Sequence, residues 1–387
     1  VFANYCTCPR ITYFSFRHNL YFNLSIFVME FLSPSFSISG NAFLYHLLFG
    51  FGLLIISIII TRLMISYVRI MDIPNDRSSH SKAIPKSGGI AIVVTFVLGM
   101  FAIYYIGTVT HINYILFFGF TFSALLIAIV SLFDDINYKS FVIKLGSHFV
   151  AASILIAFGI IITDIHLPFW GFIESFWIMY PMTLLWVVGL TNSFNFMDGL
   201  DGLSGGTAVI VSLFFGYITL MQGSIFTYII CYTIIAGSLG FLVFNFPPAR
   251  IFMGDVGSGF LGFVFAAIAI LASNHDHSHT SFFVMPLLLF NFIFDTFFTF
   301  IRRFLNGDNI SQAHKTHLYQ LLNQLGFSHK KVTLIHYMMS ISQGIGAIVL
   351  ISIPGERRLL VFIPFLIFQI IYCFFIIRSS KQKRLLG

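Results

Sequence analysis

Charged residues are scarce in this chain. Asp, Glu, Lys and Arg make up 9% of its 387 residues, whereas hydrophobic residues make up 58%. Soluble globular domains contain about 25% charged and about 45–50% apolar residues. The mean hydropathy of +0.92 agrees with this contrast. The composition therefore excludes a soluble globular protein and predicts one that is embedded in a membrane.

Several other features are missing. The four cysteines have no metal-ligand spacing, which gives no support to a metal site built on them. The short alternating segments of an outer-membrane barrel are absent, and so are an internal repeat and a soluble domain. These absences leave a bundle of helices as the interpretation of the apolar sequence.

Eleven apolar stretches are each near the roughly 20 residues that a membrane-spanning helix needs. They cover approximately residues 43–67, 88–107, 113–133, 145–163, 176–191, 204–222, 226–245, 257–273, 283–301, 332–352 and 359–378. The predicted fold class is all-α, a polytopic integral membrane protein with about eleven transmembrane helices. Residues 1–42 are expected to be an N-terminal extension, the first 28 of them either an upstream extension or a start-site artefact. Residues 43–378 are expected to form the membrane domain, and 379–387 a basic cytoplasmic tail.

The basic residues orient this bundle. Eleven alternating spans place 17 of the 21 Lys and Arg residues on one side of the membrane, and the positive-inside rule makes that side cytoplasmic. The N-terminus is then outside, and the loops 164–175, 274–282 and 353–358 are outer loops. The net charge of +7 belongs to this asymmetry and does not indicate nucleic-acid binding.

The acidic residues cluster in a few loops, although charges near a membrane are energetically costly. Eight of the fourteen carboxylates fall in five loops on the predicted cytoplasmic side. They are Asp72, Asp76, Asp134, Asp135, Asp198, Asp201, Asp255 and Asp308. Because a charge in or near hydrocarbon costs several kcal/mol, this pattern indicates one polyanionic site that binds a divalent metal and a phosphate substrate.

Two of these loops carry the strongest candidates for chemistry. Asp134 and Asp135 repel each other unless a cation is near, so the pair suits a metal or a base with a tuned pKa. Asp255 precedes a helix and is well placed to bind Mg²⁺ together with phosphate oxygens. Phe252, three residues earlier, fits either a ring for base stacking or an aromatic anchor at the membrane interface.

Three other loops add polar groups. The segment from Asn192 to Gly206 contains Asp198 and Asp201, which share a face if the backbone is helical, and four glycines that let a ligand approach. The first loop ends in Gly88-Gly89, which allows close backbone approach to a ligand. In the last loop, His314 and His317 suit charge-assisted contacts to phosphate better than a metal site. Asp295, inside the ninth span, is expected to be structural and to pair with Arg302 or Arg303.

Together the five loops resemble the polyprenyl-phosphate N-acetylhexosamine-1-phosphate transferases, over roughly residues 45–378. The resemblance implies that a lipid phosphate attacks the β-phosphate of a UDP-sugar and releases UMP, with Mg²⁺, or Mn²⁺ as the alternative, as cofactor. By motif, it implies that Asp255 and Asp134 bind the metal, that Asp134 and Asp135 form the essential acidic pair, and that Phe252 stacks on uracil. It also implies substrate contacts for Lys82, Lys86, Lys144, Asn192, Asn195, Asp198, Gly199, Asp201, Asn245, Arg303, His314 and His317.

Differences between this sequence and the motifs of the family's peptidoglycan branch narrow the choice of subfamily. That branch has three consecutive histidines in its last cytoplasmic loop, whereas this chain has His314-Lys315-Thr316-His317. The run resembles the branch that starts O-antigen repeats in the bacterial inner membrane on undecaprenyl phosphate, similar to undecaprenyl-phosphate N-acetylglucosaminyl-1-phosphate transferase. A homodimer is a further implication of the family. A secondary transporter is the alternative function, although transporters usually show related halves and broken helices at the midplane. A scaffold without catalysis is disfavoured by the retained aspartates.

Overall fold

A computed structural model gives the conformation of residues 40–68, 70–73, 83–106, 113–137, 141–167, 171–224, 226–309, 312 and 314–386. All of these residues belong to one compact unit, Ile38–Gly387. The candidate ligand Lys82, the loop residue Asp76 and residues 1–39 of the predicted extension lie outside the described residues.

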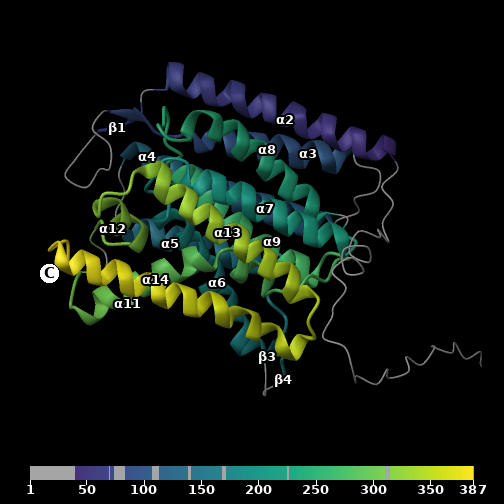
Figure 1. Cartoon of the computed structure of the whole chain (residues 1–387). Helices are drawn as coiled ribbons and strands as arrows, with labels where there is room; N and C mark the ends of the chain where they lie inside the picture. The colour runs from purple at the N-terminus through teal and green to yellow at the C-terminus, as the bar shows by residue number, and fades with distance from the viewer. Residues whose placement is uncertain are drawn as a thin grey trace, which may run out of the picture. The chain divides into compact units, whose positions relative to one another are not determined.

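Helices dominate the described chain (Figure 1). They are α2 (Gly40–Tyr67), α3 (Gly89–Ile106), α4 (Tyr114–Asn137), α5 (Phe141–Ala157), α6 (Phe176–Phe196), α7 (Leu203–Met221), α8 (Thr227–Asn245), α9 (Asp255–Asn274), α10 (Val284–Leu288), α11 (Phe290–Leu305), α12 (Leu318–Gln324), α13 (His329–Ile351), α14 (Phe362–Gln382) and the 3₁₀-helix η1 (Gly355–Val361). Two antiparallel hairpins complete the elements, β1 (Met71–Asp72) with β2 (Ile84–Pro85) and β3 (Ile165–Leu167) with β4 (Gly171–Ile173).

Helix α9 forms the centre of the bundle. Its residues from Val256 to Ala272 are all buried, and α4 and α6 pack along it. Small residues such as Gly262 permit this packing, because a Cβ added there would lie 2.9 Å from the carbonyl oxygen of Leu190 on α6. The candidate residue Asp255 is therefore fixed at the end of the most enclosed helix.

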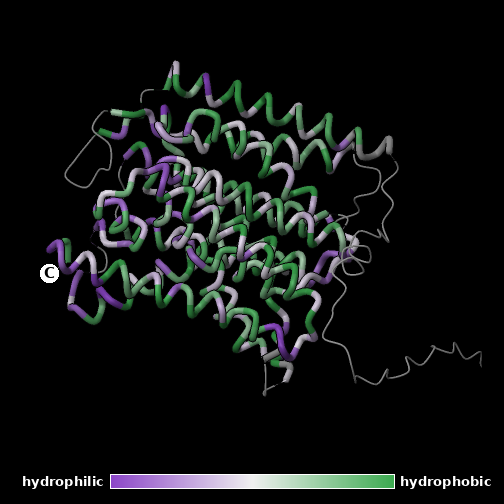
Figure 2. Tube along the Cα trace, viewed as in Figure 1, coloured by the Kyte–Doolittle hydropathy of each residue, from purple (hydrophilic) through white to green (hydrophobic). Residues whose placement is uncertain are grey.

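The peripheral helices show the reverse pattern. Leu47, Phe51 and Ile55 of α2, like Ile367 and Phe374 of α14, are exposed apolar side chains. Figure 2 shows hydrophobic residues along the helices and hydrophilic ones gathered toward the ends of the bundle. An apolar surface of this kind is stable only against lipid, where burial in water-free surroundings replaces burial in a core.

Helix α11 directs its polar residues inward. Asp295, Thr299 and Arg303 are buried, whereas Phe297 and Phe304 on the other side are each 64% exposed. The spacing of four residues places the three polar side chains on one face of the helix. In a membrane protein such a face marks a polar site inside the bundle.

The predicted spans agree with the helices in position. Each of the eleven stretches overlaps a helix. The stretch 283–301 contains two, α10 and α11, which meet at Leu289, and 359–378 begins in η1 and continues in α14. Among the described residues, seven helices are long and apolar enough to cross a membrane: α2, α4, α7, α8, α9, α13 and the η1–α14 stretch. A helical, multi-pass membrane fold is therefore confirmed. The count of eleven spans and the orientation of the termini stay predictions.

Candidate functional site

Four helix ends bring the aspartate loops together. Asp134 and Asp135 lie at the end of α4, Lys144 at the start of α5, and Asn195 at the end of α6. Asp255 is the first residue of α9. These side chains meet at the end of the bundle that carries β1 and α12 in Figure 1. The polyanionic site predicted from the sequence is therefore present for this subset of the acids.

Asp135 caps the N-terminus of α9. Its carboxylate accepts hydrogen bonds from the backbone amides of Asp255 at 3.2 Å and Val256 at 3.1 Å, and the Lys86 ammonium lies 3.3 Å away. The first amides of a helix lack intrahelical partners, and a negative charge there interacts favourably with the helix dipole. With its side chain 3% exposed, Asp135 fixes the position of Asp255 and has little surface left for a substrate.

Asp255 is held by a network of side chains. Lys144 Nζ forms an ion pair with Asp255 Oδ2, and Asn195 Nδ2 donates to Asp255 Oδ1 at 2.9 Å. Lys144 also donates to Asn195 Oδ1 at 2.8 Å, and Asn195 Nδ2 reaches Ser258 Oγ at 2.8 Å. The network fixes the orientation of the carboxylate, whose side chain is still 31% exposed.

Asp134 is the more accessible member of the acidic pair. Its side chain is 14% exposed, against 3% for Asp135. Its Oδ2 lies 3.9 Å from Lys144 Nζ, and its carboxyl contacts that of Asp255. The ammonium of Lys144 is thus within reach of both carboxylates, which shows that this position attracts a cation.

The carboxylates of Asp134 and Asp255 have the donor chemistry that magnesium requires. Mg²⁺ prefers oxygen and is usually bound by one or two carboxylates together with substrate phosphates and water. Among the described residues, no group of three or more His, Cys, Asp and Glu side chains is arranged to hold a metal ion. Two carboxylates are the number that Mg²⁺ commonly takes from a protein when other oxygens complete its ligands.

The segment from Asp198 to Asp201 is a turn and not a helix, so its two carboxylates do not share a face. Asp198 is half-buried, and burial raises its pKa to about 7, with the charges of Asp255 and Asp135 acting in the same direction. Asp198 therefore belongs electrostatically to the aspartate cluster.

Asp201 has other partners. His329 Nδ1 lies 3.1 Å from its Oδ1, and the amide of Ala249 donates to its Oδ2 at 3.1 Å. Burial opposes ionisation, but these hydrogen bonds hold the pKa of Asp201 below its ordinary value. Asp201 thus joins the α6–α7 turn to α13 and to the segment before α9.

Asn245 performs a similar joining role. Its Oδ1 accepts a hydrogen bond from the amide of Gly202 at 2.9 Å, and its Nδ2 donates to the carbonyl of Ile251 at 2.8 Å. The side chain is buried. Asn245 therefore connects two loops of the site, and a direct substrate contact stays a prediction.

Lys86 and Phe252 lie side by side. The two residues form a parallel β-bridge, with the amide of Phe252 donating to Pro85 at 2.8 Å and the amide of Gly88 donating to Phe252 at 2.9 Å. At Gly88 and Gly89 the close approach is thus made by other backbone segments of the protein. A Cβ on Gly89 would lie 2.3 Å from the Cα of Gly257. Stacking of Phe252 on a base stays a prediction.

Asn192 lies farther along α6. Its Nδ2 lies 3.1 Å from His148 Nδ1 and donates to the carbonyl of Val188 at 2.7 Å. His148 follows Lys144 by one helical turn on α5. Asn192 therefore helps join α6 to α5, the helix that carries Lys144.

The histidine segment packs beside this cluster. The rings of His314 and His317 are stacked, with centroids 4.9 Å apart, and His317 Nδ1 lies 3.1 Å from Asp295 Oδ1. Burial lowers the pKa of His314 to about 3, and the charges of His317 and the nearby arginines contribute. A charge-assisted contact of His314 with phosphate stays a prediction.

Arg303 holds the loop that follows its helix. Its guanidinium donates to the carbonyls of Asn309 at 2.7 Å and Gln312 at 3.1 Å, and lies 3.5 Å from Asp308. Arg302 donates to the carbonyl of Thr316 at 2.5 Å. The expected pairing of Asp295 with one of these arginines is replaced by its contact with His317. A substrate contact for Arg303 stays a prediction.

Sequence reasoning missed several neighbours of the site. Ser258, which bonds Asn195, lies in the Gly-rich start of α9, and its position one turn after Asp255 was the available signal. His148 was marked by its spacing from Lys144. Tyr319 approaches Gly199 so closely that a Cβ there would lie 2.2 Å from its hydroxyl oxygen, a tertiary contact that no local pattern marks.

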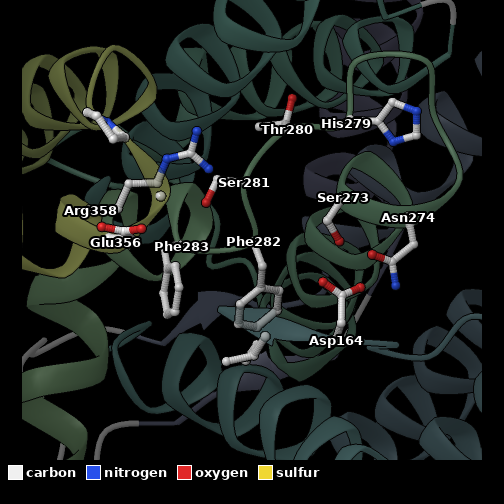
Figure 3. A pocket seen from close by; sticks show the side chains of 13 residues that line it. Asp164, Ser273, Asn274, His279, Thr280, Ser281, Phe282, Phe283, Glu356 and Arg358 are labelled. Atoms are coloured by element: carbon white, nitrogen blue, oxygen red, sulfur yellow. The ribbon is translucent and has the colours of Figure 1, made fainter. Parts of the chain in front are cut away.

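A cavity of about 450 Å³ lies at the opposite end of α9 (Figure 3). Its lining includes Asp164, Asn274, Phe282, Phe283, Glu356 and Arg358. Most of the lining belongs to three loops that the sequence places outside, 164–175, 274–282 and 353–358. Because α9 rises 1.5 Å per residue from Asp255 to Asn274, the cavity is about 30 Å from the aspartate cluster. It therefore takes no part in chemistry at that cluster.

Comparison with known proteins gives independent information. The model of glycosyl transferase family 4 matches residues 117–273. A probable undecaprenyl-phosphate N-acetylglucosaminyl 1-phosphate transferase of Bacillus subtilis is 35% identical over 325 residues, which cover 82% of this chain and 87% of the relative.

Two other relatives are more distant or match a shorter part. A decaprenyl-phosphate N-acetylglucosaminephosphotransferase of Mycobacterium leprae is 27% identical over 296 residues, covering 68% of this chain and 73% of the relative. A phospho-N-acetylmuramoyl-pentapeptide-transferase of Listeria monocytogenes is 44% identical over 108 residues, covering 28% of this chain and 33% of the relative.

Proposed function

Because the chain belongs to the polyprenyl-phosphate hexosamine-1-phosphate transferase family, we propose that it transfers an N-acetylhexosamine 1-phosphate from a UDP-sugar to undecaprenyl phosphate. The observation that carries this proposal is the contact of Asp134, Lys144 and Asn195 with Asp255 at one end of an apolar bundle. A charged site at the end of spanning helices suits the meeting of a lipid-borne phosphate with a soluble nucleotide.

In the proposed reaction, an oxygen of the lipid phosphate attacks the β-phosphorus of the UDP-sugar. The bond between that phosphorus and the oxygen bridging to the α-phosphate breaks, and UMP leaves with the electron pair. The products are UMP and a polyprenyl diphosphate sugar. Because the lipid phosphate is already anionic near neutral pH, positioning and electrostatic stabilisation contribute more than removal of a proton.

The residues of the aspartate cluster have separate roles in the proposed reaction. Asp255 and Asp134 would hold Mg²⁺, with Mn²⁺ as the alternative, and the ion would neutralise charge on the diphosphate. Asn195 and Asp135 keep Asp255 in place through the hydrogen bonds described above. Lys144, next to both carboxylates, supplies a positive charge for phosphate oxygens.

We further propose the bacterial inner membrane as the location, the cytoplasmic face for the active site, and a role in starting O-antigen or another cell-envelope polysaccharide. A homodimer remains part of the proposal. A secondary transporter is not favoured, since the relatives are named as transferases and the clustered polar residues lie at helix ends and not at the midplane.

The test is UMP release by the purified protein with undecaprenyl phosphate, Mg²⁺ and a panel of UDP-N-acetyl sugars. Asp255→Asn keeps the shape of the side chain but removes its charge, so we expect turnover to fall on the order of 100-fold or more. Asp164→Asn, at the other end of the bundle, is the matched control and should be unchanged. Normal Mg²⁺-dependent turnover in Asp255→Asn would refute the assignment.

A further inference from the structure

A buried aspartate outside the aspartate cluster has an unusual number of donors. Asp295 is 2% exposed, yet its carboxylate accepts hydrogen bonds from the amides of Leu318 at 2.9 Å and Tyr319 at 3.1 Å. The hydroxyl of Thr299 donates to it at 3.1 Å, and His317 Nδ1 lies at 3.1 Å. The side chain therefore fixes both the start of α12 and the ring of His317.

The His317 ring has one nitrogen committed and one available. Its Nδ1 faces Asp295. Nε2 forms no hydrogen bond with the described residues, and it is not one of their fully buried side-chain atoms that lack a partner. The ring stacks on His314 and lies 5.9 Å from the ring of Phe196. These two neighbouring rings and the contact with Asp295 restrict its rotation, so the direction of Nε2 is set.

The segment that contains His317 and Tyr319 is joined to the end of α6 and the turn that follows it. The Tyr319 hydroxyl donates to the carbonyl of Phe196 at 2.9 Å. Phe196 directly follows Asn195, which bonds Asp255. Gly199 lies under the Tyr319 hydroxyl, where a Cβ would come within 2.2 Å. His317 is therefore held against the same turn as the aspartate cluster.

We propose that Asp295 is a positioning residue for the transfer reaction, holding His317 so that its Nε2 accepts a hydrogen bond from a hydroxyl group of the sugar nucleotide. The inference rests on the proposed function. A carboxylate on one ring nitrogen fixes the tautomer and orientation of an imidazole, which leaves the other nitrogen as an acceptor. The acceptor nitrogen suits a hydroxyl better than a phosphate oxygen, which carries no proton to donate.

A purely structural role for Asp295 is the competing explanation, and the chain contains a matched control for it. Asp276 is also buried and also caps a helix, accepting a hydrogen bond from the amide of Thr227 at 2.9 Å and one from Ser224. It lies at the opposite end of the bundle, beyond Asn274. Asp276→Asn therefore reports what loss of a buried helix cap does by itself.

The experiment measures KM for the UDP-sugar and for undecaprenyl phosphate in detergent-purified full-length protein. Asp295→Asn and His317→Gln should each lower kcat/KM for the UDP-sugar by roughly 10-fold through KM, with the KM of the lipid unchanged. The double variant should be no worse than either single variant, because both remove one interaction. Asp276→Asn should lower the melting temperature without changing either KM.

The outcomes distinguish a failure of the positioning role from a failure of the proposed function. Unchanged KM for the UDP-sugar in Asp295→Asn, or independent effects that multiply in the double variant, would overturn the positioning role. If Asp295→Asn does not fold, His317→Gln decides alone, and an unchanged KM there overturns the inference. If the wild type releases no UMP with any donor, the proposed function fails and the inference fails with it.

Discussion

Asp134 and Asp135 are adjacent in sequence but have different surroundings. The carboxylate of Asp135 is enclosed under the first amides of α9, whereas Asp134 contacts Lys144 and Asp255. The sequence predicted that the two carboxylates act together, as a pair that suits a metal or a base. The distinction depends on where α9 begins relative to α4, which is a tertiary feature that no local pattern contains.

Asp198 gives a prediction about pH. Burial raises its pKa in the folded protein to about 7, well above the ordinary value of an aspartate, so the folded state binds a proton more tightly than the unfolded state. Its contribution to stability is full below the unfolded pKa and is lost as the pH rises through about 7. We expect the melting temperature of the wild type to fall relative to that of Asp198→Asn between pH 5 and pH 8.

The comparison is made by thermal unfolding of both proteins in the same detergent at several pH values. Asp198→Asn cannot ionise, so the difference between the two curves isolates this group from all others. Parallel curves across the whole range would show that Asp198 does not titrate in that window.

The site residues were predictable to the extent that motifs carry them. Asp134, Lys144, Asn195 and Asp255 were all expected, and the structure brings them together. The contact of Asp295 with His317 was not expected, because the two residues are 22 positions apart and the aspartate lies in an apolar stretch.

At the scale of elements, two helix starts cross at glycines. The amides of Gly88 and Gly89 donate to the carbonyls of Phe252 and Met253 at 2.9 Å each, which brings α3 against the start of α9. The glycines were expected to admit a ligand. The structure uses them for a contact between backbones, and the position of Asp255 depends on that contact.

Gly89→Ala should therefore damage the site from a distance. The new Cβ would lie 2.3 Å from backbone atoms of Gly257, which no side-chain rotation relieves. We expect a loss of about 1–3 kcal/mol in stability, with reduced UMP release. Thermal unfolding and the transferase assay check this.

Gly50→Ala in α2 is the control, because nothing lies within 4 Å of its added Cβ. An alanine in a helix interior is about 0.5–1 kcal/mol more favourable than glycine. A Gly89→Ala protein as stable and active as Gly50→Ala would contradict the tight crossing.

Helix caps form a second pattern at this scale. Asp135, Asp276 and Asp295 each accept hydrogen bonds from amides at the start of a helix, α9, α8 and α12 respectively. Each capping residue comes from a distant segment, not from the residue just before the helix. The rule of a local N-cap therefore could not have found them.

At the scale of the whole molecule, the sequence located the helices well because hydropathy is a local property. The η1–α14 stretch and α2 could be recognised without any knowledge of their neighbours. The division of 283–301 into two helices was missed, since the residues on either side of Leu289, where the two helices meet, are apolar. Which end of the bundle faces the cytoplasm depends on charge bias alone and needs a direct test.

Cysteine labelling supplies that test. Glu356 and Lys330 are exposed, at opposite predicted sides of the membrane. In a background without the four native cysteines, a membrane-impermeant maleimide should label Glu356→Cys in spheroplasts and Lys330→Cys only after permeabilisation. The reverse pattern would place the aspartate cluster on the outer face and exclude a cytoplasmic nucleotide as its substrate.

The hydrogen bond between Asp135 and the amide of Asp255 spans 120 positions of the chain. A ribosome makes the chain from the N-terminus, so α4 and its carboxylates enter the membrane long before the helix that they cap exists. Until α9 arrives, Asp135 must be satisfied by water or lipid headgroups near the surface. The aspartate cluster is thus completed late in synthesis, and a nascent chain that stops before Asp255 lacks the residue at its centre.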